Sequence, residues 1–304
     1  MLRSLFIGLS RNQAVRGWAE RSPLGRRLAA RFVAGLSVEE AVAACGRVNA
    51  QCIAVSLDSL GESVAAATEA RAAAEIYRRL LDAIAMKGLR ANVSLKLTQM
   101  GMDIDPDLAE EIVGEVVEHA ARVGSFVRID MEGSAYTEAT IALTERLHAR
   151  FPGSVGTVLQ AYLYRTEADM ERLLGRGIRI RLCKGAYKER PEVAFPRKAD
   201  VDANYVKLMK QMTTSGVFCG IATHDGAIVE EMLRFVRERG VEKSAFEFQM
   251  LYGVRRDLQQ RLVAEGFGVR VYVPFGTAWY PYFMRRLAER PANVVFLARN
   301  LLRS

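Results

Sequence analysis

The stretch CIAVSLDSLGESVAAATEARAAAEIYRRLLDAIAMKGLRANVSLKL, residues 52–97, contains two short β-rich runs with a long helical pattern between them. The first run ends at Asp58 and the second near Lys96. Between the runs, alanine and leucine recur at the spacing of a helix with one apolar face. Because parallel strands need a long crossover, usually a helix, this order predicts a strand–helix–strand unit of a parallel sheet.

The same alternation continues along most of the chain. Eight β-rich runs occur at fairly even spacing, with helical patterns between them: CIAVSLD, NVSLKL, FVRIDM, GTVLQAY, IRIRLCK, FCGIATH, FEFQML and VRVYVPF. Two of the helical patterns have clear start signals, Asp105 before Pro106 and Thr166 three residues before Asp169. Strand–helix units in this number predict a (βα)8 barrel of the α/β class. A doubly wound open sheet is the alternative, but the first run is not followed by the GxGxxG turn of dinucleotide-binding sheets.

The predicted strands divide the chain into two regions. Residues 1–50 form an N-terminal helical arm, in which Ser37 and Glu40 have the spacing of a capping box. Residues 51–304 form the barrel domain, including the C-terminal helices. No stretch rich in proline, glycine or serine separates further domains.

The first 36 residues are rich in arginine and nearly free of acids. They allow three interpretations: an organellar transit peptide, a basic amphipathic helix on a membrane surface, or a packed helical extension. The amphipathic interpretation rests on an apolar stripe made of Leu2, Leu5, Phe6 and Leu9. The packed extension is favoured.

The composition argues against several classes of protein. Four cysteines without a CxxC pair and three dispersed histidines indicate neither a disulfide framework nor a metal site, and they favour the cytosol. No apolar run reaches the roughly 18 residues of a membrane-spanning helix. The formal net charge is +8, but there is no Lys-rich block, zinc-finger spacing or RNA-binding aromatic signature. Nucleic acid is therefore not an expected partner.

Polar side chains stand where the predicted strands end, which in such barrels is the site of catalysis. The strand bodies are apolar, whereas these ends carry Asp58, Lys96, Asp130, Gln160, Arg181 with Lys184, His224, Gln249 and Tyr272. The cations outnumber the acids, which predicts a pocket for phosphate, carboxylate or an electron-rich intermediate. Gly185 and Ala186 would let backbone N–H groups approach such an anion closely.

The last helical pattern, WYPYFMRRLAER at residues 279–290, places Arg285 and Arg286 side by side ahead of Glu289. A solvated face with a weak Arg–Glu pair is the simple interpretation. The aromatic residues nearby favour a second one, in which the two arginines bind a carboxylate against an aromatic wall. These aromatics are Tyr272, Trp279, Tyr280 and Tyr282.

Several of these segments closely resemble the proline dehydrogenase family, from about residue 53 to residue 297. They are SLDSLGE, SLKLTQMG, RLCKGAY, ATHD, FEFQMLYG and VYVPFGTAWYPYFMRRLAE. The resemblance implies a monofunctional bacterial-type enzyme on a distorted (βα)8 TIM barrel. It would use FAD to oxidise L-proline to Δ1-pyrroline-5-carboxylate, the first step of proline catabolism to glutamate, and would pass electrons to a membrane quinone.

The resemblance also implies roles for individual residues on the substrate side. Lys96, Arg285 and Arg286 would bind the proline carboxylate. Tyr272 and Leu251 would pack against the pyrrolidine ring while a hydride passes from C5 to flavin N5.

On the cofactor side, Arg181 would lie near flavin N5 and Gln160 would contact the ring system. Asp130 would hold the hydrogen-bond network of the site together. The remaining cofactor contacts would come from Lys184, Gly185, Ala186, Tyr187, Thr223, His224 and Glu289. Thr223 and His224 would reach the ribityl-phosphate region, and Glu289 would support both the cofactor and the neighbouring arginines.

The expected partners are L-proline, a quinone and, downstream, a separate pyrroline-5-carboxylate dehydrogenase. The expected location is the cytoplasm, with peripheral contact on the inner face of the cytoplasmic membrane. Two rival functions remain: a class I aldolase-like barrel with Lys96 or Lys184 as the Schiff-base amine, and a non-catalytic protein whose basic N-terminus binds nucleic acid or anionic lipid.

Overall fold

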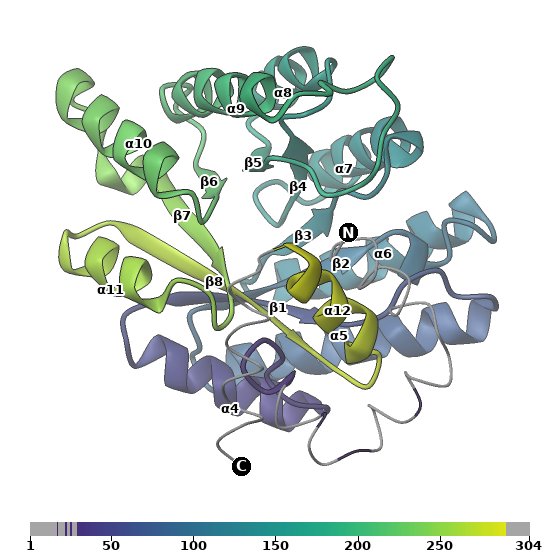
Figure 1. The fold of residues 1–304 in the computed structure, drawn as a ribbon. Coiled ribbons are helices and arrows are strands. Elements are labelled where there is room, and N and C mark those ends of the chain that lie inside the picture. The colour runs from purple at the N-terminus through teal and green to yellow at the C-terminus, as the bar shows by residue number, and fades with distance from the viewer. Residues whose placement is uncertain (1–16, 18–21, 23–24, 26–28, 290–304) are drawn as a thin grey trace.

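The computed structural model describes residues 17, 22, 25 and 29–289, with side chains described as far as residue 284. Eight strands close into a barrel in the order of the sequence, and every neighbouring pair is parallel (Figure 1). The strands are β1 (Ala54–Ser59), β2 (Ala91–Lys96), β3 (Val127–Asp130), β4 (Val155–Gln160), β5 (Arg179–Cys183), β6 (Cys219–Ala222), β7 (Phe246–Leu251) and β8 (Gly268–Phe275). Because β1 pairs with both β2 and β8, the predicted barrel is confirmed and the open sheet is excluded.

Helices follow the strands and cover the outside of the barrel (Figure 1). Short 3₁₀ turns are η1 (Thr98–Met100), η2 (Ser134–Tyr136) and η3 (Lys243–Ala245). The α-helices are α4 (Val38–Asn49), α5 (Ala67–Met86), α6 (Pro106–Arg122), α7 (Thr137–Arg150), α8 (Thr166–Leu174), α9 (Lys198–Thr213), α10 (Gly226–Arg239), α11 (Arg256–Ala264) and α12 (Trp279–Glu289).

Most of the helix-start signals act as the sequence predicts. The capping box of Ser37 and Glu40 begins α4, and the Asp105 carboxylate accepts the Asp107 N–H at the start of α6. Thr166 differs, because it is the first residue of α8 rather than its cap. Its hydroxyl donates instead to the Gln160 carbonyl at 2.6 Å, which fixes the loop after β4.

The barrel interior differs from the apolar strand bodies that the sequence predicts. Val55 and Leu57 of β1 belong to the apolar core shared with the surrounding helices. Ser56 and Asp58 alternate with them, and Ser56 meets Arg181 of β5 across the barrel. Since successive residues of a strand point to opposite faces, the inward face of the barrel is polar while the outward face is apolar.

The N-terminal region joins the barrel through α4. Val38, Ala41 and Cys45 of this helix are buried in the main apolar core, against β1 and β8. The proposed stripe of Leu2, Leu5, Phe6 and Leu9 lies outside the described residues. The domain boundary at residue 50 stays a prediction.

A second apolar cluster lies at the carboxyl end of the barrel. Trp279, Tyr280 and Phe283 of α12 pack there with Phe32 and Leu60. Because Leu60 directly follows β1 and α12 follows β8, this cluster places α12 beside the strand ends. The aromatic residues of the last helical pattern are therefore mainly packing residues that position α12.

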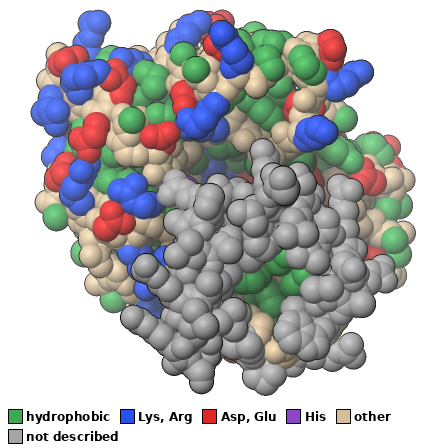
Figure 2. Space-filling model, in the orientation of Figure 1, with side chains coloured by type: hydrophobic (Ala, Val, Ile, Leu, Met, Phe, Trp, Pro, Cys, Tyr) green, Lys and Arg blue, Asp and Glu red, His purple; other side chains and the backbone are tan. Residues whose placement is uncertain are grey.

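The described surface carries mixed charge. On the face that Figure 2 shows, Lys and Arg side chains intermingle with Asp and Glu, without one large patch of a single sign. Exposed ion pairs among the described residues include Arg79 with Glu39 and Arg146 with Glu110. Among the described residues, no helix combines the length and the apolar character needed to cross a membrane.

Candidate active site

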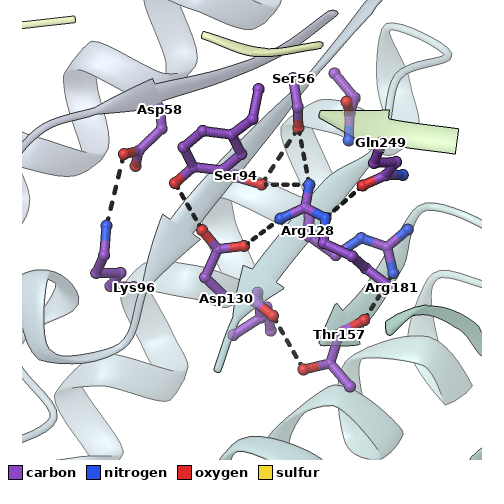
Figure 3. Close-up of polar contacts among 12 residues, drawn as sticks. Ser56, Asp58, Ser94, Lys96, Arg128, Asp130, Thr157, Arg181 and Gln249 are labelled. Carbon is purple, nitrogen blue, oxygen red and sulfur yellow. Dashed lines mark hydrogen bonds and ion pairs between the residues drawn. The ribbon is translucent and has the colours of Figure 1, made fainter. Parts of the chain in front are cut away.

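Five of the predicted strand-end residues converge at the carboxyl end of the barrel. Tyr272 Oη donates to Asp130 Oδ2 at 2.8 Å. Arg181 Nη1 donates to Asp130 Oδ1 at 2.8 Å (Figure 3). Lys96 Nζ lies 3.5 Å from Asp58 Oδ2 on the neighbouring strand. The carboxylate of Asp130 thus joins the aromatic side chain of β8 to the arginine of β5.

Arg181 is buried and held on every side of its guanidinium group. Besides Asp130, Nε donates to Gln249 Oε1 at 2.5 Å, and Nη2 donates to Ser56 and Ser94 at 3.3 and 3.2 Å. Its central carbon lies 5.3 Å from the centre of the Tyr272 ring, within range of a cation–π contact. These bonds allow the charge of Arg181 to be buried inside the barrel.

The surplus of positive charge predicted for the strand ends is not found among the described residues. Arg181 pairs with Asp130, and Lys96 lies against Asp58. Lys184 Nζ is shared by two carboxylates, Asp202 at 2.5 Å and Asp225 at 2.9 Å. The expectation was wrong because it counted only strand ends, whereas the partners of Lys184 come from α9 and from the loop after β6. The side chains of Arg285, Arg286 and Glu289 lie outside the described residues.

Lys96 keeps its proton in this environment. Burial lowers the pKa of Lys96, but the carboxylates of Asp58 and Asp130 raise it by more, so the pKa lies above its ordinary value. A Schiff-base lysine needs a lowered pKa instead. The lysine chemistry that the aldolase interpretation assigned to Lys96 is therefore disfavoured.

Asp58 is the most deeply buried acid of the site. Burial raises the pKa of Asp58, with Lys96 acting in the opposite direction. Its Oδ2 accepts no hydrogen bond from the described residues, and Tyr77 Oη lies 3.4 Å from Oδ1. Tyr77 also donates to Gln99 Oε1 at 3.1 Å, so a buried polar layer supports the Asp58–Lys96 pair from behind.

Tyr272 stays a neutral phenol. Burial and then the neighbouring Asp130 and Asp58 carboxylates raise the pKa of Tyr272 well above its ordinary value. Its hydroxyl therefore acts as a hydrogen-bond donor, and its ring stands beside the strand end of β7.

The Leu251 N–H donates to His224 Nε2 at 2.8 Å, which makes Nδ1 the protonated nitrogen of a neutral His224.

The loop after β5 begins with Lys184, Gly185, Ala186 and Tyr187, the predicted cofactor residues. Gly185 has a φ of +111°, and a Cβ there would lie 2.4 Å from the Tyr162 ring. Only glycine fits this position without strain. The side chains of Ala186 and Tyr187 are exposed.

Sequence reasoning did not connect the next segment, residues 188–197, to the site. Glu189 fastens it to the loop after β3 by accepting the Ser134 N–H at 2.7 Å and the Ser134 hydroxyl at 2.5 Å. Its carboxylate also accepts the Tyr162 hydroxyl at 3.4 Å. The backbone of the predicted cofactor loop is thereby held from both sides.

Gln160 and Thr223 complete the predicted set on β4 and after β6. Gln160 Nε2 donates to the Glu132 carbonyl at 2.9 Å, and Thr223 Oγ1 accepts the Asp225 N–H at 3.1 Å. These bonds leave one amide hydrogen of Gln160, one Nη1 hydrogen of Arg181 and the hydroxyl hydrogen of Thr223 as donors at the adjoining ends of β4, β5 and β6. This donor set, beside a glycine that keeps Tyr162 close to the loop, fits a planar ring bearing carbonyl and nitrogen acceptors.

Five of the residues that sequence reasoning missed share one signal: each is a polar residue two positions before a strand-end residue. Because side chains on one face of a strand recur at every second position, such pairs point into the barrel together. The pairs are Ser56 with Asp58, Ser94 with Lys96, Arg128 with Asp130, Glu247 with Gln249 and Arg270 with Tyr272.

A cavity of about 1110 Å³ opens at the other end of the barrel. Its lining includes the first residues of four strands, Ala54, Ala91, Phe246 and Gly268. It lies away from the strand-end cluster, and active sites of such barrels occupy the carboxyl ends of the strands. The cavity is therefore not the candidate active site.

Known proteins that resemble this chain show the family to which it belongs. The family model of proline dehydrogenase matches residues 41–299. The chain belongs to the proline dehydrogenase family. It is 40% identical over 304 residues to proline dehydrogenase 1 of Bacillus subtilis (strain 168), covering 100% of both chains. It is 42% identical over 280 residues to the proline dehydrogenase of Deinococcus radiodurans, covering 91% of this chain and 90% of that one.

A solved structure with the same fold is proline utilization A (PutA) of Bdellovibrio bacteriovorus, with a TM-score of 0.81 and 24% identity. The match covers 87% of this chain and 33% of that chain, so this chain spans about a third of that protein. At this identity the likeness supports the barrel fold of the family. It carries no assignment of individual residues.

Proposed function

We propose that this member of the proline dehydrogenase family uses FAD to oxidise L-proline to Δ1-pyrroline-5-carboxylate. The observation that carries the proposal is the Tyr272–Asp130–Arg181 network at the strand ends, where the family resemblance places substrate and cofactor. It combines a buried aromatic side chain for an apolar ring with a fixed cation for developing negative charge. Family membership and the residue geometry thus support the same chemistry.

On the substrate side, proline offers one anionic group and an apolar ring, so binding must combine cations with an apolar wall. Lys96 would contribute a permanent charge toward the carboxylate, because its pKa is raised. Arg285 and Arg286 would complete the clamp from α12. Tyr272 and Leu251, neighbours in the register of β7 and β8, would pack against the ring.

On the cofactor side, bound FAD would supply the acceptor for the hydride that leaves C5 of proline. Arg181 would lie beside N5, with its guanidinium group held by Asp130, and Gln160 would contact the ring system. The loop that begins at Gly185 and includes Lys184, Ala186 and Tyr187 would line the cofactor. Thr223 and His224 would reach its ribityl-phosphate region, and Glu289 would support it from α12.

The role of the protein residues is to align the reacting atoms and to exclude water from them. Oxidation of bound proline removes a hydride from C5 and a proton from the ring nitrogen, leaving a C=N bond. Holding C5 against its acceptor accounts for much of the rate enhancement in such transfers. Arg181 would stabilise the negative charge that accompanies reduction, because it is cationic and nearly excluded from water.

The electrons would pass to a membrane quinone, and the product would enter the route to glutamate through a separate pyrroline-5-carboxylate dehydrogenase. The protein would then work in the cytoplasm and touch the inner face of the cytoplasmic membrane, with residues 1–36 as the contact. Deleting these residues should weaken binding to anionic liposomes. Unchanged binding would remove the arm from this role.

The visible absorption spectrum tests the proposal directly. The purified protein should show a flavin spectrum that bleaches under anaerobic L-proline and persists with D-proline. A flavin spectrum that ignores L-proline would contradict the substrate. A colourless protein that cannot be reconstituted with FAD would contradict the cofactor, and trapping of a carbonyl substrate by borohydride would then favour the lysine chemistry.

Two substitutions test the carboxylate clamp, and one substrate tests the ring pocket. Arg285→Met and Arg286→Met should each raise KM for L-proline far more than they reduce bound flavin. Normal proline affinity in both variants would refute the clamp. The bulk of Tyr272 should make trans-4-hydroxyproline a poor substrate, and efficient turnover of that compound would contradict the assigned contact.

A further inference from the structure

A chain of hydrogen bonds continues from the site into the barrel interior, away from the strand ends. Arg181 Nε donates to Gln249 Oε1 at 2.5 Å, and Gln249 Nε2 donates to Glu247 Oε1 at 2.6 Å. Arg270 Nε donates to the same Glu247 oxygen at 2.5 Å. Figure 3 shows the contact between Arg181 and Gln249. Gln249 and Glu247 are both buried.

The chemistry of the two neighbours leaves the Gln249 amide one orientation. A guanidinium group only donates hydrogen bonds, and an ionised carboxylate only accepts them. The amide oxygen must therefore face Arg181, and the amide nitrogen must face Glu247. Reversing the amide would place its N–H₂ against the Arg181 N–H and its oxygen against the Glu247 carboxylate.

Glu247 is itself held in place, so it serves as a fixed reference for Gln249. Arg270 pairs with it, and Arg270 Nη1 donates to Asn92 Oδ1 at 2.9 Å and to the Val55 carbonyl at 2.8 Å. The Glu247–Arg270 pair is thus fastened to β1 and β2 across the barrel. Because Gln249 bonds to both Glu247 and Arg181, the fixed Glu247 carboxylate also restrains the Arg181 guanidinium group.

Gly220 of β6 makes this contact possible. Gly220 lies between Arg181 of β5 and Glu247 of β7, because it pairs in register with both residues. A Cβ at this position would lie 2.4 Å from Gln249 Nε2. A larger residue at position 220 would therefore push the Gln249 amide away from Arg181.

We infer that Gln249, oriented by Glu247 and admitted by Gly220, is a positioning residue for the Arg181 guanidinium group. Asp130 accepts from Nη1, and the Ser56 and Ser94 hydroxyls accept from Nη2. Gln249 accepts from Nε and so restrains the remaining nitrogen of the guanidinium group. The inference rests on the proposed function, in which Arg181 stabilises reduced flavin. It assigns to Gln249 a share in setting the reduction potential without contact with the flavin.

The test compares Gln249→Leu with Gln259→Leu in the full chain loaded with FAD. Both glutamines are buried, and within the described part of the chain the side chain of Gln259 in α11 donates to the Val254 carbonyl at 2.8 Å and makes no other hydrogen bond, so it is a matched control for the loss of a buried amide. The reduction potential of bound flavin is measured without proline, and the dissociation constant of FAD is measured alongside. Gln249→Leu should lower the relative affinity for reduced over oxidised flavin about tenfold. For a two-electron couple this is about 30 mV.

A potential in Gln249→Leu equal to that of Gln259→Leu would overturn the inference while leaving the proposed function intact. Gly220→Ala provides a second route, because it keeps Gln249 and displaces only its amide. Like Gln249→Leu, Gly220→Ala should lower the reduction potential of the bound flavin. An unchanged potential in Gly220→Ala would also overturn the inference. A wild-type protein that binds no flavin would overturn the inference together with the proposed function.

Discussion

Replacing Asp130 by asparagine removes one charge from the barrel interior while nearly preserving the side-chain shape. The side chains of Arg181 and Asp130 are only 8% and 12% exposed, and their N···O distance is 2.8 Å. Removing one partner of a buried ion pair typically costs about 3–5 kcal/mol, because the other charge stays buried. Arg181 keeps Gln249 and two serine hydroxyls as acceptors, so the expected loss is about 3 kcal/mol.

The loss should be measured as the free energy of unfolding of the FAD-free protein, by urea denaturation followed with far-UV circular dichroism. The apoprotein is used because bound FAD would add its own stabilisation. At about 2 °C per kcal/mol for a large domain, the melting temperature should fall by about 6 °C.

The matched control is Asp200→Asn. Arg197 donates to Asp200 at 2.7 Å, but the arginine side chain is 77% exposed, so this pair should contribute little to the free energy of unfolding. Equal losses in Asp130→Asn and Asp200→Asn would refute the reasoning that the interior charge depends on its partner. The double variant Asp130→Asn/Arg181→Met should recover part of the loss, because no unpaired charge is then buried.

Three further predictions concern protonation, backbone shape and thiol reactivity. The pKa of Lys96 is raised above 10.5 in the folded protein, so its ion pair contributes fully to the free energy of unfolding below pH 10.5 and is lost only as the pH rises through the folded value. The unfolding free energy lost in Lys96→Met should therefore be the same at pH 7 and pH 9. A difference between the two pH values would contradict a Lys96 that stays charged. Gly185→Ala should lower the free energy of unfolding by about 1–3 kcal/mol and reduce the FAD that the protein retains. Gly124 also has a positive φ but open space around it, so Gly124→Ala should retain its FAD. Equal loss of FAD in both variants would exclude the close approach of Gly185 to Tyr162 as the cause. Cys52 is exposed, whereas burial raises the pKa of Cys45 to about 12 and of Cys183 to about 11, so a thiol reagent at pH 8 should modify Cys52 first, as peptide mapping would show.

The local pattern of the chain was enough to predict the barrel. Helix and strand periods, caps such as Asp105 and glycines after helices act over a few residues, so they can be recognised without knowing the tertiary structure. The strand ends follow from the same pattern, which is why Asp58, Lys96, Asp130, Arg181 and Tyr272 were predicted to lie together. The motifs carrying the family resemblance are equally local.

The pairing of the charges could not be predicted in this way. Arg181 meets Ser56 across 125 positions of sequence, and Lys184 receives its carboxylates from α9 and from the loop after β6. A list of strand-end residues therefore indicated an excess of positive charge where the folded chain has ion pairs. The polar inner face was also missed, although the pairs at every second position, such as Glu247 with Gln249, were present in the sequence.

The sequence by itself determined the order of strands and helices, the family, and the residue types that reach the carboxyl end of the barrel. Only the tertiary structure decided that Lys96 remains a cation, that Asp130 joins Tyr272 to Arg181, and that Gly220 lets Gln249 reach Arg181. The reason is that periodicity and capping are interactions between near neighbours in the chain. Pairing, burial and pKa depend instead on distances across the closed barrel, and these exist only once β1 has met β8.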